Sequence, residues 1–307
     1  MKSNIRVIEK IGSKPGKTTI ILAGIHGNEI CGVKALDKLI PSLKIESGRV
    51  ILIYANLEAI KQNKRFIEKN LNRCFVEKQP EDMINTIEGR TAKEIIPYLD
   101  SADILLDLHA SNNPDTIPFV ICDEKQIANA SIFDANIISF NWDPFEPGST
   151  DYYMNKKNKP AFCFECGYAN DKNTIKIAKK AIINFLTFTK NISGNLRIKE
   201  NQKFYRIKSI YKNKSYPFKK SRFFMDFEKV NQETIIGLEG DQSVWINKND
   251  AVLFLKDSEN LNEECFLIAE EINKETLINK QNMNKENEVN IKWIFYLYAN
   301  ITYFEVR

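Results

Sequence analysis

Apolar runs alternate with helical hydrophobic spacing over the first 190 or so residues. Five short runs rich in β-branched and aromatic residues predict buried strands: Thr18–Ile25, Val50–Tyr54, Ile104–Leu108, Pro118–Cys122 and Ala161–Phe164. Between and after them, apolar residues recur with helical periodicity from Ile30 to Ile40 and from Ile175 to Phe188. Continuously apolar strands that alternate with helices predict an α/β fold with a mostly parallel mixed sheet flanked by helices.

The pattern changes after Asn191–Asn195. Short alternating segments follow, separated by glycine and aspartate turns: Phe204–Ile210, Thr234–Ile236, Ser243–Ile246 and Cys265–Ala269. We therefore expect a larger domain over residues 1–193 and a smaller all-β C-terminal domain over residues 194–307, with an atypical tail from about residue 273. The tail holds a polar stretch (279–288) and two apolar runs (293–298 and 301–304), for which a strand or a partner contact is favoured over contact with a membrane surface.

Composition narrows the class of protein. The chain has 307 residues, of which 43% are hydrophobic, so it is neither wholly disordered nor fibrous. Its net charge of +4 is spread along the chain and gives no reason to expect a nucleic-acid partner. The basic, aromatic-containing stretch 212–220 is more typical of a solvated β-edge or loop than of a nucleic-acid site.

The sequence also predicts a location. The N-terminus lacks the apolar core of a secretory signal, and no run of about twenty apolar residues could form a membrane span. The six cysteines are mostly scattered, as expected for reduced thiols of a cytoplasmic protein. The pair Cys163 and Cys166 has no second pair with which to hold a structural zinc ion, so both are read as buried strand residues.

The chain has only two histidines, His26 and His109, and each stands at the end of a predicted strand. Ligands of open α/β sheets bind beyond the carboxyl ends of the strands, so the two imidazoles are expected to share one crevice. Glu29 completes a set of two histidines and one carboxylate, which is a catalytic zinc pattern that leaves a position for water. Asp107 is a candidate partner for the ligating imidazole of His109 or, alternatively, a structural polar residue. The same ligands also suit other divalent ions.

Four motifs, in order, resemble the succinylglutamate desuccinylase/aspartoacylase family, a branch of the zinc carboxypeptidase-like hydrolases. They begin at Gly24 (GIHGNE), Arg65 (RFIEKNLNR), Leu105 (LLDLHAS) and Phe164 (FECG), and they span roughly the first 170 residues. The resemblance implies that residues 1–193 form the catalytic domain and that the β-rich segment is a second domain. It also implies that His26, Glu29 and His109 hold one Zn²⁺ per chain, and that Glu165 is the catalytic carboxylate.

The implied reaction is hydrolysis of the amide bond of a small-molecule N-acyl amino acid, with an acetyl or succinyl group. Zinc would activate water, and Glu165 would serve as general base. Arg65 matches the arginine that polarises the scissile carbonyl, and Asn72 and Arg73 match the pair that holds the substrate carboxylate. The alternatives are a metallocarboxypeptidase that acts on short peptides and a catalytically decayed zinc-binding protein. A homo-oligomer is compatible with the sequence, which leaves the oligomeric state open.

Two departures from the family pattern concern the substrate. Asn70 stands where the family usually has aspartate, so one supporting charge is lost. Aspartoacylases also resemble one another in having an arginine shortly before the catalytic glutamate, and this arginine binds the second carboxylate of the substrate. The segment 151–160 has no arginine, and Lys156, Lys157 and Lys159 are either substitutes or solvated surface residues.

Overall fold

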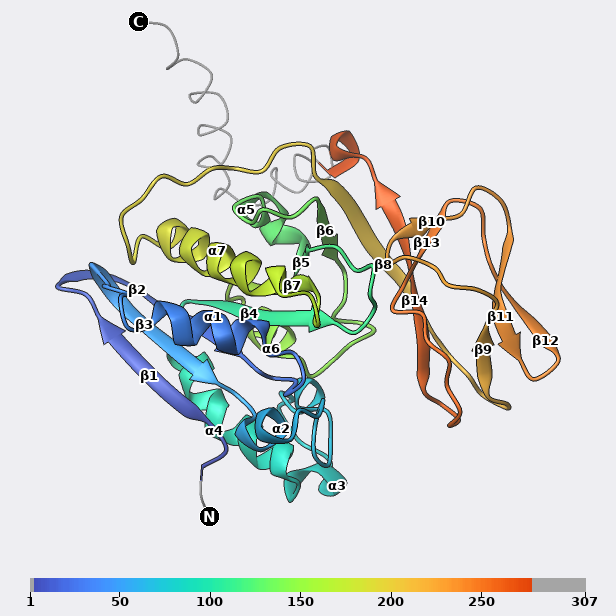
Figure 1. Ribbon diagram of the computed structural model, residues 1–307, viewed down its shortest axis with the longest axis horizontal. Helices are drawn as coiled ribbons and strands as arrows, with labels where there is room; N and C mark the ends of the chain where they lie inside the picture. Colours follow the sequence, from blue (N-terminus) through green and yellow to red (C-terminus); the bar gives the residue numbers. More distant parts are fainter. Residues whose placement is uncertain (1–2, 278–307) are drawn as a thin grey trace, which may run out of the picture.

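The computed structural model describes residues 3–277, and within them one large mixed sheet runs through the molecule (Figure 1). Its strand order is β1-β3-β2-β4-β7-β5-β6-β8-β14-β13-β10. The strands of the first 170 residues are β1 (Arg6–Ile11), β2 (Lys14–Ala23), β3 (Ser47–Tyr54), β4 (Ile104–Ser111), β5 (Phe119–Cys122), β6 (Ile137–Phe140) and β7 (Ala161–Tyr168). The five strands predicted from apolar runs are among them, and the predicted α/β fold class is confirmed.

Most strand pairs in this part of the sheet are parallel, namely β2 with β3, β2 with β4, β4 with β7, and β5 with β6. Strand β1 at the edge and the pair of β5 with β7 are antiparallel. Strands β1 and β6 were not foreseen: β1 is half-exposed and polar, and the four-residue β6 is too short for a clear periodicity.

Helices cover both faces of the sheet because its central strands are apolar on both sides. On one face, α1 (Cys31–Leu39), α5 (Ile127–Ala130) and α7 (Asn173–Phe188) pack against the sheet in the larger core. On the other face lie α4 (Ile87–Ser101) and α6 (Thr150–Lys156). Successive residues of β2 alternate between the two cores, with Ile21 in one and Ile20 and Leu22 in the other. The short helices α2 (Leu57–Gln62), α3 (Glu81–Ile84), η1 (Leu71–Arg73) and η2 (Glu124–Gln126) lie in the connections.

The β-rich segment continues the same sheet. Strand β8 (Lys203–Lys212) pairs in parallel with β6 and antiparallel with β14 (Glu264–Ile272), and β13 (Asp250–Leu253) and β10 (Glu228–Lys229) follow. A separate antiparallel sheet holds β12 (Gln242–Ile246), β11 (Thr234–Glu239) and β9 (Phe218–Lys220). Because the large sheet crosses residue 193, the division into two domains stays a prediction.

Several sequence expectations concern features outside the site. The polar stretch 279–288 and the apolar runs at 293–304 lie outside the described residues. All six cysteines are free and buried, as predicted for reduced thiols. Within residues 3–277, no helix combines the length and apolar character needed to cross a bilayer.

Candidate active site

Three neighbouring parallel strands bring the predicted metal ligands and Glu165 to one edge of the sheet. His26 and Glu29 follow the end of β2, His109 lies near the end of β4, and Glu165 lies on β7. The order β2-β4-β7 makes these strands adjacent, and the Cα atoms of His109 and Glu165 are register partners. The carboxyl ends of the strands therefore form the crevice expected for an open α/β sheet.

The turn between β2 and α1 depends on glycine. Gly24 has φ +77°, a left-handed conformation that favours glycine. A Cβ atom on Gly27 would lie 2.1 Å from the carbonyl carbon of Ala59 in α2, so the backbone contact excludes any side chain. The glycines around His26 are thus required by the turn and by close packing against α2.

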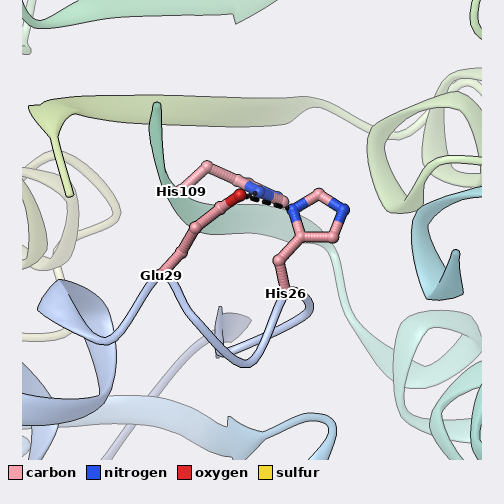
Figure 2. A group of neighbouring side chains, drawn as sticks. All are labelled: His26, Glu29 and His109. Atoms are coloured by element: carbon pink, nitrogen blue, oxygen red, sulfur yellow. Dashed lines mark hydrogen bonds and ion pairs between the residues drawn. The ribbon is translucent and has the colours of Figure 1, made fainter. Parts of the chain in front are cut away.

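The three predicted ligands converge, as Figure 2 shows. His26 Nδ1 lies 2.8 Å from Glu29 Oε1, and His109 Nδ1 lies 3.0 Å from Glu29 Oε2. One potential ligand atom from each residue fits within 4.8 Å of the other two, and all three side chains are buried. His26 Nδ1 lacks the geometry of a hydrogen bond despite its short distance to Glu29, as expected of an atom directed at a shared point.

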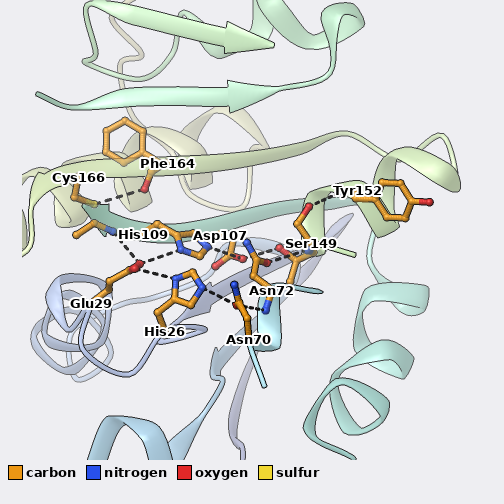
Figure 3. A network of polar contacts seen from close by, with 12 residues as sticks. His26, Glu29, Asn70, Asn72, Asp107, His109, Ser149, Tyr152, Phe164 and Cys166 are labelled. Atoms are coloured by element: carbon orange, nitrogen blue, oxygen red, sulfur yellow. Dashed lines mark hydrogen bonds and ion pairs between the residues drawn. The ribbon is translucent and has the colours of Figure 1, made fainter. Parts of the chain in front are cut away.

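The outer nitrogen of each imidazole faces an oxygen acceptor (Figure 3). His26 Nε2 lies 3.0 Å from Asn70 Oδ1, and His109 Nε2 lies 3.1 Å from Asp107 Oδ2, where it is close enough for an ion pair but lacks the geometry of a hydrogen bond. Metal-ligating histidines usually direct their second ring nitrogen at such an acceptor, which fixes the tautomer and the orientation of the ring. The residues present therefore fit a metal ion, and Asp107 and Asn70 occupy the supporting positions.

Electrostatics also suit a bound cation. Burial lowers the pKa of His26 to about 4, which keeps its imidazole neutral and able to ligate. Burial opposes the charge of Glu29, but the two imidazoles and Arg65 hold the pKa of that carboxyl well below its usual range. Burial likewise opposes a proton on His109, while Cys163 and Asp107 raise its pKa, and a metal ion would take the place of that proton.

Glu165 lies beside this cluster. It is 9% exposed, and its Oε2 atom has no hydrogen-bond partner among residues 3–277. Burial raises the pKa of Glu165 to about 8, so the carboxyl can both accept and return a proton near neutral pH. Glu165, His109 and Cys163 form a second group that could hold a metal ion. The first group has the ligand set of a catalytic zinc site, and it leaves Glu165 available as a base.

A cavity of about 750 Å³ contains the predicted ligands, Glu165 and the three predicted polar contacts. Arg65 is half-exposed, and its Nη1 donates to Glu29 Oε1 at 2.8 Å. Arg73 forms an ion pair with Glu146, and Asn72 Oδ1 accepts a hydrogen bond from the backbone N–H of Thr150. All seven predicted site residues thus line one cavity.

The loop that carries Arg65 is held by a buried carboxylate that the sequence did not reveal. Glu88 of α4 is fully buried and accepts hydrogen bonds from the backbone N–H groups of Ile67, Glu68 and Lys69 at 2.7, 3.2 and 3.0 Å. The amide of Asn56 donates to the same carboxylate at 3.3 Å. In the sequence, Glu88 is one of many helical glutamates, so no local signal could have identified it.

The three lysines considered as substitutes for the missing arginine point elsewhere. Lys156 lies over the ring of Tyr152, Lys157 forms an ion pair with Asp100 at 2.5 Å, and Lys159 donates to the backbone oxygen of Asp100 at 2.6 Å. None of the three lines the cavity. Two lysines of the β-rich segment do line the cavity, Lys220 and Lys256. Lys220 belongs to the basic stretch 212–220 that was expected to be solvated, and no local signal marked Lys256.

Solved structures of known proteins share this fold. The chain superimposes on the succinylglutamate desuccinylase of Vibrio cholerae with a TM-score of 0.75, at 18% identity, over 87% of this chain and 86% of that one. It superimposes on the product-bound ectoine utilization protein EutE (DoeB) of Ruegeria pomeroyi with a TM-score of 0.66, at 17% identity, over 88% of this chain and 99% of that one. The protein is therefore an α/β protein of the desuccinylase/aspartoacylase fold.

Sequence comparison establishes the family. The model of the succinylglutamate desuccinylase/aspartoacylase catalytic domain matches residues 15–189, more than half of the chain. The chain belongs to this family, which confirms the resemblance drawn from the four motifs. Among curated relatives, a probable aspartoacylase from Nostoc is 32% identical over 30% of this chain and 34% of its own length. The N-alpha-acetyl-L-2,4-diaminobutyric acid deacetylase of Halomonas elongata is 26% identical over 62% of this chain and 60% of its own length. The match thus spans only about a third of the first of these relatives.

Proposed function

We propose that the protein is a zinc-dependent amidohydrolase that cleaves the amide bond of small N-acyl amino acids. One observation carries the proposal: two imidazoles, a carboxylate and a separate buried glutamate converge in a single cavity. Membership of the desuccinylase/aspartoacylase family supports it, as do relatives named for deacylation of aspartate, succinylglutamate and diaminobutyrate derivatives.

His26, Glu29 and His109 would hold the metal ion. When bound there, zinc supplies a Lewis acid for the amide oxygen and lowers the pKa of water. Glu165 takes the proton of the attacking water and returns it to the nitrogen of the leaving amine. Its low exposure and raised pKa suit both transfers.

The arginines position and stabilise the substrate in this proposal. Arg65 lies next to Glu29, where its guanidinium can donate to the oxygen on which negative charge develops. Arg73 offers a planar fork for the carboxylate of the amino acid, and Asn72 adds a neutral polar contact. The ion pair with Glu146 pre-positions the Arg73 guanidinium.

The test combines metal analysis with a deacylation screen. The expected result is one zinc ion per chain in the wild type, loss of metal in His26→Ala and in His109→Ala, and a folded, metal-loaded but inactive Glu165→Gln. The screen crosses acetyl and succinyl groups with acidic, neutral and basic amino acids, and blocked dipeptides serve as the comparison. Full turnover by Glu165→Gln would refute the mechanism, and a preference for the dipeptides would replace deacylation with carboxypeptidase activity.

A further inference from the structure

A smaller cavity adjoins the candidate active site. Its volume is about 210 Å³, and it shares Ile121, Trp142 and Asp151 with the larger cavity. We call it the acidic branch, because its charged lining residues are all carboxylates: Asp123, Glu124, Asp143 and Asp151. No lysine or arginine of the described chain lines it.

Asp151 is the central residue of the acidic branch. It is only 5% exposed, and it lines both cavities. Among the described residues it forms no ion pair: its side chain is hydrogen-bonded to that of Ser149, and His109 and Arg73 act on its charge only through space. Carboxylates are almost never fully buried without a cationic partner, because desolvation of the charge is costly. A buried carboxylate that faces a cavity and lacks such a partner indicates a cation supplied by the ligand.

Asp143 adds a second negative charge. The amide of Asn155 contacts both of its oxygens at 3.3 Å, and the positive charge of Lys156 offsets part of its charge without forming an ion pair. Burial and the neighbouring charge of Asp151 raise the pKa of Asp143 to about 6. A bound cation would offset both the cost of burying the Asp143 charge and its repulsion by Asp151.

The acidic branch lies beside the part of the site proposed to hold the amino acid. Asn72 Oδ1 accepts a hydrogen bond from the backbone N–H of Thr150, the residue before Asp151. An amino acid whose carboxylate is bound by Asn72 and Arg73 therefore has its Cα atom near the branch. Lys220 and Lys256 line only the larger cavity, so a negatively charged acyl group would find its counter-charge there.

We propose that the acidic branch is the subsite for the amino-acid side chain, and that the preferred substrates are N-acyl amino acids with a cationic side chain. This inference rests on the proposed function and specifies its substrate class. It also agrees with the absence of Lys156, Lys157 and Lys159 from the lining of both cavities.

The experiment compares compounds that differ by a single amine. Nα-acetylornithine is paired with Nα-acetylnorvaline, which has the same chain length without the amine, and Nα-acetylaspartate and Nα-acetylglutamate complete the set. We expect wild-type kcat/KM to be at least about tenfold higher for acetylornithine than for acetylnorvaline, as for a desolvated charge pair. Asp151→Asn should reduce that ratio to about one and Asp143→Asn should reduce it partly, whereas the exposed Asp241→Asn should leave it unchanged.

Binding separates this inference from the proposed function. Calorimetry on Glu165→Gln, with ornithine and norvaline as probes, reports the subsite without turnover. The inference is supported if Glu165→Gln binds ornithine more tightly than norvaline and if the Glu165→Gln/Asp151→Asn double variant loses this preference. This holds even if the wild type hydrolyses none of the compounds. Hydrolysis that favours acidic or neutral amino acids would overturn the subsite and leave the deacylase proposal intact. Equal binding of the two probes would overturn it as well. Thermal unfolding of each variant confirms that the protein is folded.

Discussion

Replacing Glu88 by glutamine tests whether a buried carboxylate holds the loop that carries Arg65. Each oxygen of Glu88 accepts from two donors: Oε1 from Asn56 and Ile67, and Oε2 from Glu68 and Lys69. Glutamine keeps one acceptor oxygen and presents an NH₂ group in place of the other. Two donors therefore lose their partner inside a fully buried site.

The magnitude follows from these contacts. A buried donor without a partner costs about 1–3 kcal/mol, so two of them cost about 2–6 kcal/mol. A neutral side chain is easier to bury than a carboxylate, which offsets part of this cost. We expect Glu88→Gln to lower the free energy of unfolding by about 2–4 kcal/mol. At roughly 2–4 °C per kcal/mol, Tm falls by about 4–16 °C.

The assay is urea-induced unfolding followed by fluorescence, with a thermal scan alongside. Lys93→Gln, an exposed substitution on the same helix, is the control and should change stability by less than about 0.5 kcal/mol. If Glu88→Gln were as stable as this control, the carboxylate would not be what holds residues 67–69.

Three further predictions concern other parts of the molecule. Glu239 accepts a hydrogen bond from the Tyr211 hydroxyl, and this bond is the largest of the causes that hold the pKa of Glu239 at about 2, below the usual 4.5. The stabilisation is therefore complete above pH 4.5 and is lost as the pH falls towards 2, so urea unfolding of Glu239→Gln and wild type should differ at pH 7 and converge in acid. Gly27→Ala should lower the free energy of unfolding in urea by about 1–3 kcal/mol, because its Cβ would collide with the backbone of Ala59. Gly194→Ala is the control, because its Cβ would come no closer than 3.3 Å to a neighbouring atom, the side-chain oxygen of Thr187; equal effects would contradict the packing argument. Chelation of the metal should lower Tm, and zinc at about 100 times its Kd should raise the free energy of unfolding by about 2.7 kcal/mol relative to the metal-free protein. If zinc left Tm unchanged, this would count against a metal site in the folded chain.

Local sequence was sufficient for the strands and for the residues that carry chemistry. Apolar runs identified β2, β3, β4, β5 and β7, because a strand buried on both faces is recognisable without its neighbours. His26 and His109 were recognisable as site residues because they follow such strands and because parallel strands end at one edge. The order of motifs was enough to assign the family, which the match over residues 15–189 confirms.

Tertiary structure alone decided which strands are neighbours and which charges are buried. The pairing of β6 with β8 extends the large sheet into the β-rich segment, and no local pattern encodes a pairing between strands some 65 residues apart. Glu88 and Asp151 look like ordinary helical acids in the sequence, yet packing buries both. Burial gives these two carboxylates their proposed roles, because a charge removed from water must be matched by nearby donors or by a ligand. The sequence alone therefore determined the fold class, the family and the candidate metal ligands. Only the long-range contacts buried Asp151 beside the cavity, and the proposed cationic side chain of the substrate is inferred from that burial.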